Sequence, residues 1–313
     1  MRYGTIMQAD GTARRVARLV LGTARFGGSI SRDAAFQLMD EYFAAGGNAL
    51  DTARVYCAWL PNGQDASERT VGEWIRSRGV EKEIFLMTKG GHYALDDQAR
   101  TPRLSEKEIR ADMTRSLEVL GLPRVALYYL HRDDPARPVS EIMETLNALA
   151  AEGAALALGA SNWRAARIAE ANAWAAARGK AGFSASEIQW SYADFSAAVT
   201  DDTLVGMDAA EETAYAQMGL PVVAYSCQSG GVFSCGYRPD LSDAAPRHQA
   251  YVNAENIRRY RALLEKCAAV PGMTPSRVML EYITEHPRLN GFALIGASRP
   301  EQLRQSLAAM EQR

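Results

Sequence analysis

Short apolar runs alternate with longer amphipathic segments along the chain, and this alternation constrains the fold more than any other feature. The apolar runs are residues 19–21, 49–50, 84–87, 125–130, 156–159, 185–188, 221–224 and 292–295. Segments with helical periodicity occur at residues 32–45, 67–78, 106–120, 140–152, 164–178, 253–268 and 275–285. Repeated βα units are typical of a parallel sheet. Eight strands of this kind predict a closed (β/α)8 TIM barrel, and we expect residues 1–313 to form one domain.

Turn residues separate the predicted elements. Glycine follows five of the predicted helices, where a left-handed C-cap is needed, at Gly46, Gly79, Gly121, Gly153 and Gly179. The Asp10-Gly11 pair precedes the first strand and predicts a β-hairpin that caps the bottom of the barrel. Residues 226–249 contain glycine and proline and show little periodicity, so we expect a long loop over the site after the seventh strand.

The composition is that of a globular protein without affinity for polyanions. Hydrophobic residues make up 47% of the chain and charged residues 23%, which excludes a largely disordered protein. The formal net charge of -2 favours neither nucleic acid nor a membrane surface as a partner. We expect no signal peptide, no membrane-spanning segment and no bound metal. A reducing cytoplasm suits the few cysteines, which lack metal-site spacing: Cys57, Cys227, Cys235 and Cys267.

Four polar residues lie at or shortly after the C-terminal ends of predicted strands, where a (β/α)8 barrel carries its active site: Asp51, Tyr56, Lys89 and His131. A tyrosine has a pKa of about 10, which a neighbouring ammonium group lowers. We therefore expect Lys89 to lower the pKa of Tyr56. Asp51 would keep Lys89 charged, and His131 would hydrogen-bond the same substrate oxygen as Tyr56. This arrangement suits the reduction of a carbonyl group.

These four residues resemble the tetrad of the aldo-keto reductases, which is an aspartate, a tyrosine, a lysine and a histidine in this order along a barrel. Residues 51–56, 67–72, 88–90, 130–131 and 296–302 are similar to motifs of that family. The resemblance extends from Leu19 to about Leu307. It implies an NADP-dependent oxidoreductase that reduces an aldehyde or ketone, with Tyr56 as the proton donor.

The resemblance also implies NADPH rather than NADH, bound extended across the barrel rim. Residues that would hold the nicotinamide carboxamide are Ser161, Asn162 and Gln189, and Tyr225 would stack on the ring. Residues along the pyrophosphate would be Ser226, Gln228 and Gly230. A 2′-phosphate at a helix N-terminus would meet Ser298, Arg299 and Gln302. The remaining predicted contacts are Gly22, Thr23, Asp51, Gly296 and Ser306. The family often has a Glu-Asn pair where this chain has Gln305-Ser306.

Residues close to the tetrad in the sequence are expected to line the substrate mouth, namely Trp59, His92, Arg132 and Trp163. Their aromatic rings and short polar groups favour a sugar-like substrate. Two other functions stay open. Lys89 could form a Schiff base in a barrel aldolase, or the chain could be an NADP-binding regulatory protein with little turnover.

Overall fold

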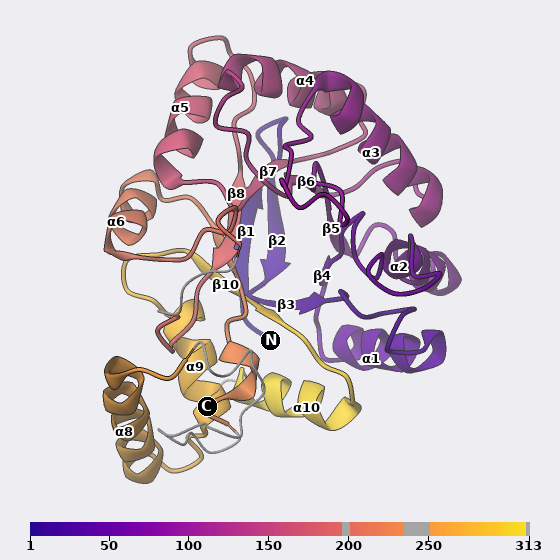
Figure 1. The fold of residues 1–313 in the computed structure, drawn as a ribbon. Helices are drawn as coiled ribbons and strands as arrows, with labels where there is room; N and C mark the ends of the chain where they lie inside the picture. Colours follow the sequence, from indigo (N-terminus) through magenta and orange to yellow (C-terminus); the bar gives the residue numbers. More distant parts are fainter. Residues whose placement is uncertain (196–200, 235–250, 311–313) are drawn as a thin grey trace.

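A closed barrel of parallel strands forms the centre of the computed structural model, which describes residues 1–195, 201–234 and 251–310 (Figure 1). Its strands are β3 (Leu19–Gly22), β4 (Ala49–Asp51), β5 (Phe85–Gly90), β6 (Leu127–Leu130), β7 (Leu158–Ser161), β8 (Ala185–Gln189), β9 (Val222–Tyr225) and β10 (Gly291–Ile295). Around the barrel they follow the order β10-β3-β4-β5-β6-β7-β8-β9, and β9 pairs with β10 to close it. The predicted (β/α)8 barrel is confirmed.

Helices surround the barrel (Figure 1). They are α1 (Arg32–Ala44), α2 (Ala66–Arg78), α3 (Glu106–Leu120), α4 (Val139–Ala151), α5 (Ala165–Ala176), α6 (Ala209–Met218), α8 (Ala254–Ala269), α9 (Pro275–Thr284) and α10 (Pro300–Ala309). Local sequence sets their ends. Ser105 and Glu108 form a reciprocal capping box at the start of α3, and Gly121 ends this helix with a φ of 63°. Helix α6 was not predicted, although the Asp208 side chain caps its N-terminus.

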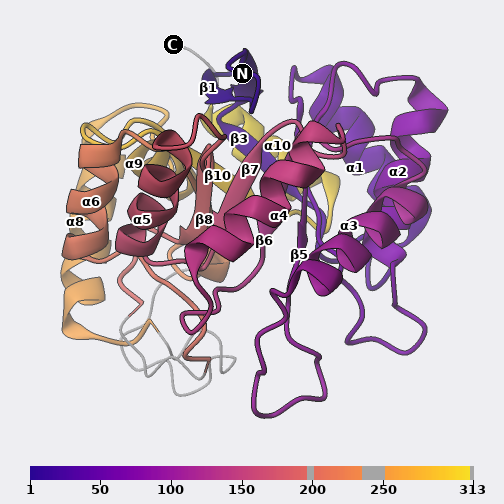
Figure 2. The same cartoon turned by 90° about the horizontal axis from the view of Figure 1, so that it is seen from above.

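The N-terminal residues form a hairpin that closes one end of the barrel. Strands β1 (Tyr3–Met7) and β2 (Ala13–Ala17) pair antiparallel. Figure 2 shows this hairpin at the end opposite to the long loop that follows β5. Ile6, Val16 and Ala17 of the hairpin are buried in the same cluster as the barrel interior, so the predicted cap is confirmed. The predicted loop at residues 226–249 begins with the short helix η1 (Ser229–Gly231), and residues 235–250 lie outside the described part.

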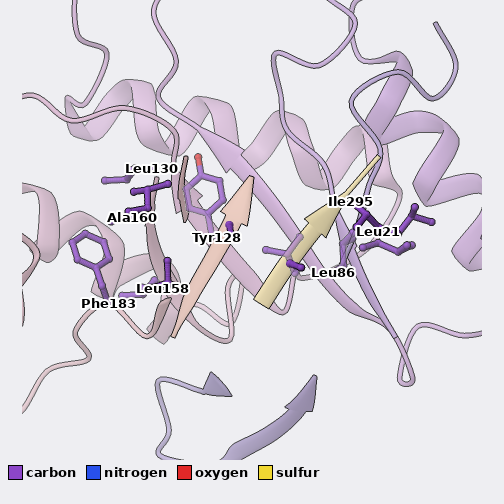
Figure 3. Close-up of a cluster of buried hydrophobic side chains, with 14 of the residues drawn as sticks. Leu21, Leu86, Tyr128, Leu130, Leu158, Ala160, Phe183 and Ile295 are labelled. Carbon is purple, nitrogen blue, oxygen red and sulfur yellow. The ribbon is translucent and has the colours of Figure 1, made fainter. Parts of the chain in front are cut away.

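Alternate residues of each strand pack on opposite sides of the barrel wall. One set faces the helices, as Leu86, Leu130 and Ile295 do in Figure 3. The other set fills the interior, where apolar side chains pack against the hairpin: Val20, Ala49, Phe85, Met87, Leu127, Tyr129, Ala157, Ala185, Val223 and Phe292. The interior is therefore a packed core, and a site can form only at the end away from the hairpin.

Three strands differ from their predicted bounds by two residues or more, because hydrogen-bonding register, rather than apolar character, sets where a strand begins and ends. Strand β5 continues through Thr88 and Lys89 to Gly90, and β6 begins at Leu127 instead of residue 125. Strand β7 lies two residues later than predicted and ends at Ser161. Polar residues at the rim thus belong to the strands themselves, which holds their backbones in fixed positions.

The cysteines that the structure describes, Cys57, Cys227 and Cys267, are free thiols, and Cys235 lies outside the described residues. Across the described ranges, no helix combines the length and the apolar character that crossing a membrane requires. Within the same ranges, no group of three or more histidine, cysteine, aspartate or glutamate side chains is placed to hold a metal ion.

Gly159 of β7 gives the Tyr129 ring its space inside the barrel, because a Cβ at this position would lie 2.4 Å from the ring. We expect Gly159→Ala to lower the free energy of unfolding by about 1–3 kcal/mol, since the buried ring cannot move without repacking. Gly206→Ala is the control, because its Cβ would have one neighbour at 3.9 Å. Urea denaturation measures both. Wild-type stability in Gly159→Ala would contradict this packing argument.

Candidate active site

The register of the strands brings three of the predicted catalytic residues to one rim. Asp51 is the last residue of β4 and pairs with Met87 of β5, two residues before Lys89. Lys89 pairs in turn with Tyr129 of β6, two residues before His131. Because parallel strands end at the same edge, the three side chains converge there.

Tyr56 reaches the same rim from the loop after β4. A backbone hydrogen bond holds this loop against β5, the strand that carries Lys89: the Arg54 N–H donates to the Lys89 carbonyl at 3.0 Å. A turn then follows, in which the Tyr56 N–H donates to the Ala53 carbonyl at 3.0 Å. The position of the phenol is therefore set by backbone hydrogen bonds.

The Lys89 ammonium group joins the site together. Its Nζ lies 2.5 Å from both carboxylate oxygens of Asp51 and 3.1 Å from the Tyr56 hydroxyl oxygen. It also donates to the Thr52 carbonyl at 3.1 Å. Lys89 and Asp51 are both fully buried. Burial lowers the pKa of Lys89, but the surrounding negative charge raises it more, so the net pKa is above its usual value. Lys89 is held as a cation.

Glu187 of β8 is a third ionisable group around this lysine, after Asp51 and Tyr56, and the sequence analysis did not identify it. Its Oε1 lies 3.3 Å from Lys89 Nζ, and its side chain is almost completely buried. One feature of the sequence could have identified Glu187: it is a charged residue, two positions before Gln189, in a strand whose other residues are typical of a buried strand. Alternation along the strand places Glu187 on the interior side with Gln189.

Lys89 lowers the pKa of Tyr56 as predicted, but the net pKa of Tyr56 is raised instead of lowered. Burial raises the pKa of Tyr56, and although Lys89 lowers it, the carboxylates of Asp51 and Glu187 raise it again. The net pKa lies above the ordinary value for tyrosine. The phenol therefore stays protonated at neutral pH, with a cation 3.1 Å from its oxygen.

His131 faces Tyr56 edge-on, with the ring centroids 6.0 Å apart. Its Nδ1 is buried and has no hydrogen-bond partner within the described residues. Burial, followed by the positive charge of Arg132, lowers the pKa of His131 well below its usual value. The neutral imidazole is thus available to hydrogen-bond a ligand beside the phenol.

A cleft of about 660 Å³ opens beside Asp51 and Tyr56 and runs to the N-terminal end of α10. Ten of the predicted cofactor residues line it: Gly22, Asp51, Tyr225, Ser226, Gln228, Gly230, Gly296, Ser298, Gln302 and Ser306. The sequence analysis missed Arg25, which also lines the cleft and follows β3 by three residues. Small residues, a cation and a helix N-terminus fit an elongated phosphate-containing ligand.

The other predicted cofactor residues do not line this cleft, namely Thr23, Ser161, Asn162, Gln189 and Arg299. Thr23 is fully buried and its hydroxyl donates to the Asp51 carbonyl at 2.8 Å, so this side chain supports the residue that ends β4. Asn162 accepts hydrogen bonds from the Tyr225 hydroxyl at 2.8 Å and the Val205 N–H at 3.2 Å. Asn162 therefore orients Tyr225 at the edge of the cleft.

Residues 18–313 match the sequence model of the aldo/keto reductase family. This chain belongs to the aldo/keto reductase family. The uncharacterized oxidoreductase YrpG of Bacillus subtilis is 29% identical over 96% of this chain and 89% of its own length. Norsolorinic acid reductase stcV of Emericella nidulans is 33% identical over 58% of this chain and 49% of its own length. The aryl-alcohol dehydrogenase [NADP(+)] of Phanerodontia chrysosporium is 29% identical over 58% of this chain and 50% of its own length. The matches therefore span about half of the last two relatives. As a member of this family, the protein is an oxidoreductase.

In this aldo/keto reductase, the predicted substrate residues separate into two groups. The rings of Trp59 and His92 lie beside the tetrad, 6.4 Å from Tyr56 and 4.8 Å from His131 respectively, measured between centroids. The prediction that Trp163 lines the substrate mouth is wrong, because its ring is fully buried and packs edge-on against Phe183. It faces the helices, and its Nε1 donates to a backbone carbonyl at 3.1 Å. Trp163 therefore has no surface open to a substrate.

Arg132 connects two loops above the reductase site. It donates to Thr203 Oγ1 at 2.8 Å and lies 3.6 Å from Asp201 in the loop after β8. Tyr93, in the loop after β5, donates to the same Asp201 at 2.7 Å. The sequence analysis missed Asp201 and Thr203 because they are remote from the tetrad in the chain. Arg132 is occupied by these contacts, so it shapes the mouth chiefly by positioning the loops.

Burial, together with the charge of Arg132, lowers the pKa of His92 to about 4. The unfolded chain takes up this proton below about pH 6.5, and the folded protein does so only near pH 4. Stability contributed by neutral His92 is therefore present above that range and is lost as the pH falls through it. We expect the imidazole NMR signals, assigned by their loss in His92→Gln, to stay in the neutral form at pH 5.5. Titration near pH 6.5 would contradict this.

Proposed function

We propose that this aldo/keto reductase uses NADPH to reduce an aldehyde or ketone to an alcohol, with Tyr56 as the proton donor. The observation that carries the proposal is the position of Lys89, whose Nζ contacts both Asp51 and the Tyr56 hydroxyl at the end of the cleft. A protonated phenol beside a fixed cation is the arrangement that a carbonyl oxygen gaining negative charge requires.

Each member of the tetrad has a separate role in this proposal. When bound, the nicotinamide would supply the hydride that the carbonyl carbon requires. Tyr56 gives its proton to the carbonyl oxygen, and Lys89 stabilises the phenolate that remains. Asp51 keeps Lys89 charged and oriented, while His131 hydrogen-bonds the carbonyl oxygen and fixes its direction.

The cleft offers partners for the rest of the cofactor. Tyr225 would stack on the nicotinamide ring, and Arg25 would meet the negative charge of the pyrophosphate along with Ser226, Gln228 and Gly230. At α10 the N-cap residue Arg299 makes no side-chain cap, and the Ser298 N–H donates to the Gln302 side chain at 2.9 Å, so a bound phosphate would take the place of that side-chain oxygen. Arg299 and Ser298 at this end support a 2′-phosphate and hence NADPH.

The substrate side of the site is lined by flat rings, with Trp59 about half exposed at its edge. Such walls accept an aromatic ring or the apolar face of a sugar. The names of two relatives, norsolorinic acid reductase and aryl-alcohol dehydrogenase, favour an aryl carbonyl. We expect a panel of aryl aldehydes, aryl ketones and aldose sugars to separate these classes by kcat/KM.

The aldolase alternative fits this geometry less well. A Schiff-base lysine must lose its proton, whereas the Asp51 carboxylate 2.5 Å from Lys89 Nζ holds the lysine as a cation. Borohydride treatment with substrate is expected to leave Lys89 unmodified, and a covalent adduct on Lys89 would favour the aldolase.

The other alternative is a regulatory protein with little turnover. Binding of NADPH without its consumption, across the whole carbonyl panel, would favour that alternative.

Replacing the proton donor tests the main proposal. We expect Tyr56→Phe to lower kcat about 10²–10⁴-fold in an assay of NADPH consumption, because the phenolic proton is lost. Cofactor affinity, measured by fluorescence quenching, is expected to stay within about threefold of wild type. The matched control is Tyr215→Phe, which removes a buried hydroxyl whose partner is Ser186 at 2.7 Å. Full activity in Tyr56→Phe would exclude this residue as the acid.

Arg299 tests the cofactor preference. We expect Arg299→Ala to weaken NADPH binding about tenfold and to leave NADH binding unchanged, since a charged hydrogen bond to the 2′-phosphate would be lost. Arg288→Ala is the matched control, because this exposed arginine precedes β10, whereas Arg299 follows it, and Arg288 pairs with Glu212 of α6. Equal effects of Arg299→Ala on both dinucleotides would argue against a phosphate contact.

A further inference from the structure

Glu187 lies inside the barrel, directly behind the catalytic lysine. On β8 it pairs with Ser161 of β7 and Val223 of β9. Its side chain is 3% exposed, and its Oε1 lies 3.3 Å from Lys89 Nζ on the far side of the barrel. None of the tetrad roles assigned above requires this carboxyl group, so its presence needs a separate explanation.

The charges around Glu187 are unbalanced if every carboxyl group is ionised. One ammonium group then faces two buried carboxylates, which leaves a net negative charge out of contact with water. Such a charge is costly, and a buried carboxyl group commonly takes up a proton instead. The titratable groups that face Glu187 come from β4, β5, β6, β9 and the loop after β4, and are Asp51, Lys89, Tyr129, Tyr225 and Tyr56. Strand β7 contributes no ionisable residue.

The contacts of Glu187 show where a proton would go. Its Oε2 is buried and finds no hydrogen-bond partner within the described residues. Asp51 and Glu187 contact the same ammonium group, at 2.5 Å and 3.3 Å from Lys89 Nζ, so the two carboxyl groups lie close to one another. Two ionised carboxylates repel at such a distance, whereas a protonated one donates to the other.

We propose that Glu187 is a positioning residue that carries a proton at neutral pH, donates it toward Asp51, and so leaves Lys89 facing one ionised carboxylate instead of two. Burial and the neighbouring Asp51 together raise the pKa of Glu187 to about 8, against the opposing effect of Lys89. The proton stays on Glu187 during the reaction and is not transferred to the substrate.

The consequence for catalysis rests on the function proposed above. Ionised Glu187 raises the pKa of Tyr56, and it also competes with the forming phenolate for the charge of Lys89. Reduction is therefore expected to slow as the pH rises through about 8. It should fall to a lower plateau, about three- to tenfold down, rather than to zero, because Tyr56 itself remains protonated.

Infrared spectroscopy of the protein without substrate tests the proton directly. We expect a carbonyl stretch of a protonated carboxylic acid at pH 6.5 that disappears toward pH 9.5 and is missing in Glu187→Gln. Glu68→Gln is the matched control, since Glu68 is also buried, burial raises its pKa, and Thr88 donates to it at 2.7 Å; the band assigned to Glu187 should persist in this variant. Absence of the band in wild type, or its survival in Glu187→Gln, would overturn the proposal. This readout needs no turnover, so it is decided separately from the proposed reductase activity.

The pH profile of kcat tests the coupling to Tyr56. We expect Glu187→Gln to keep activity at pH 7 within about threefold of wild type and to lose the fall near pH 8, because glutamine cannot ionise but can still donate to Asp51. Glu187→Met, also neutral, is expected to be slower at every pH with the same flat profile. Glu68→Gln should keep the wild-type profile. A fall near pH 8 that persists in both Glu187 variants would overturn the coupling.

Discussion

The burial of the Lys89 ammonium group is the constraint on which the rest of the structure depends. A lysine without solvent contact is unstable unless a carboxylate pairs with it and polar groups satisfy its other protons. Here the two carboxyl groups that contact Lys89 come from β4 and β8, on opposite sides of the barrel, so only the closed barrel brings both to Lys89 on β5. Closure of the fold and assembly of the site are therefore the same event.

The parts of the structure that could be predicted depend on local patterns. Each βα unit shows its own apolar run and helical periodicity, so the barrel follows from repetition. Asp51, Lys89 and His131 could be grouped because parallel strands end at one rim, and their position after the strands was visible in the sequence. The strand ends themselves were less predictable, because Thr88 and Ser161 extend β5 and β7 through hydrogen bonds to neighbouring strands.

The parts that could not be predicted depend on contacts around the barrel. Glu187 reads as one charged residue within a short strand, and only closure shows that it faces Lys89. The same limit explains the error over the pKa of Tyr56, since the lysine was visible as a neighbour but the burial and the second carboxylate were not. Trp163 was wrongly predicted to line the substrate mouth. At the end of a strand, a shift of one residue decides whether a side chain faces the rim or the helices, and the Trp163 ring packs against Phe183 instead.

The two ends of the barrel interior contribute differently: one end is filled with apolar side chains that stabilise the fold, and the other holds the charged groups of the site. A charged cluster in a protein interior is generally less stable than apolar residues of similar volume. The layers toward the hairpin are apolar and closely packed, with Tyr129 filling the space that Gly159 leaves. Directly above them, the carboxyl group of Glu187 and the ammonium group of Lys89 replace what could be apolar packing. The close packing below therefore offsets the burial of charge, and it gives the polar layer a rigid base on which the Lys89 ammonium and the Tyr56 hydroxyl can be held 3.1 Å apart.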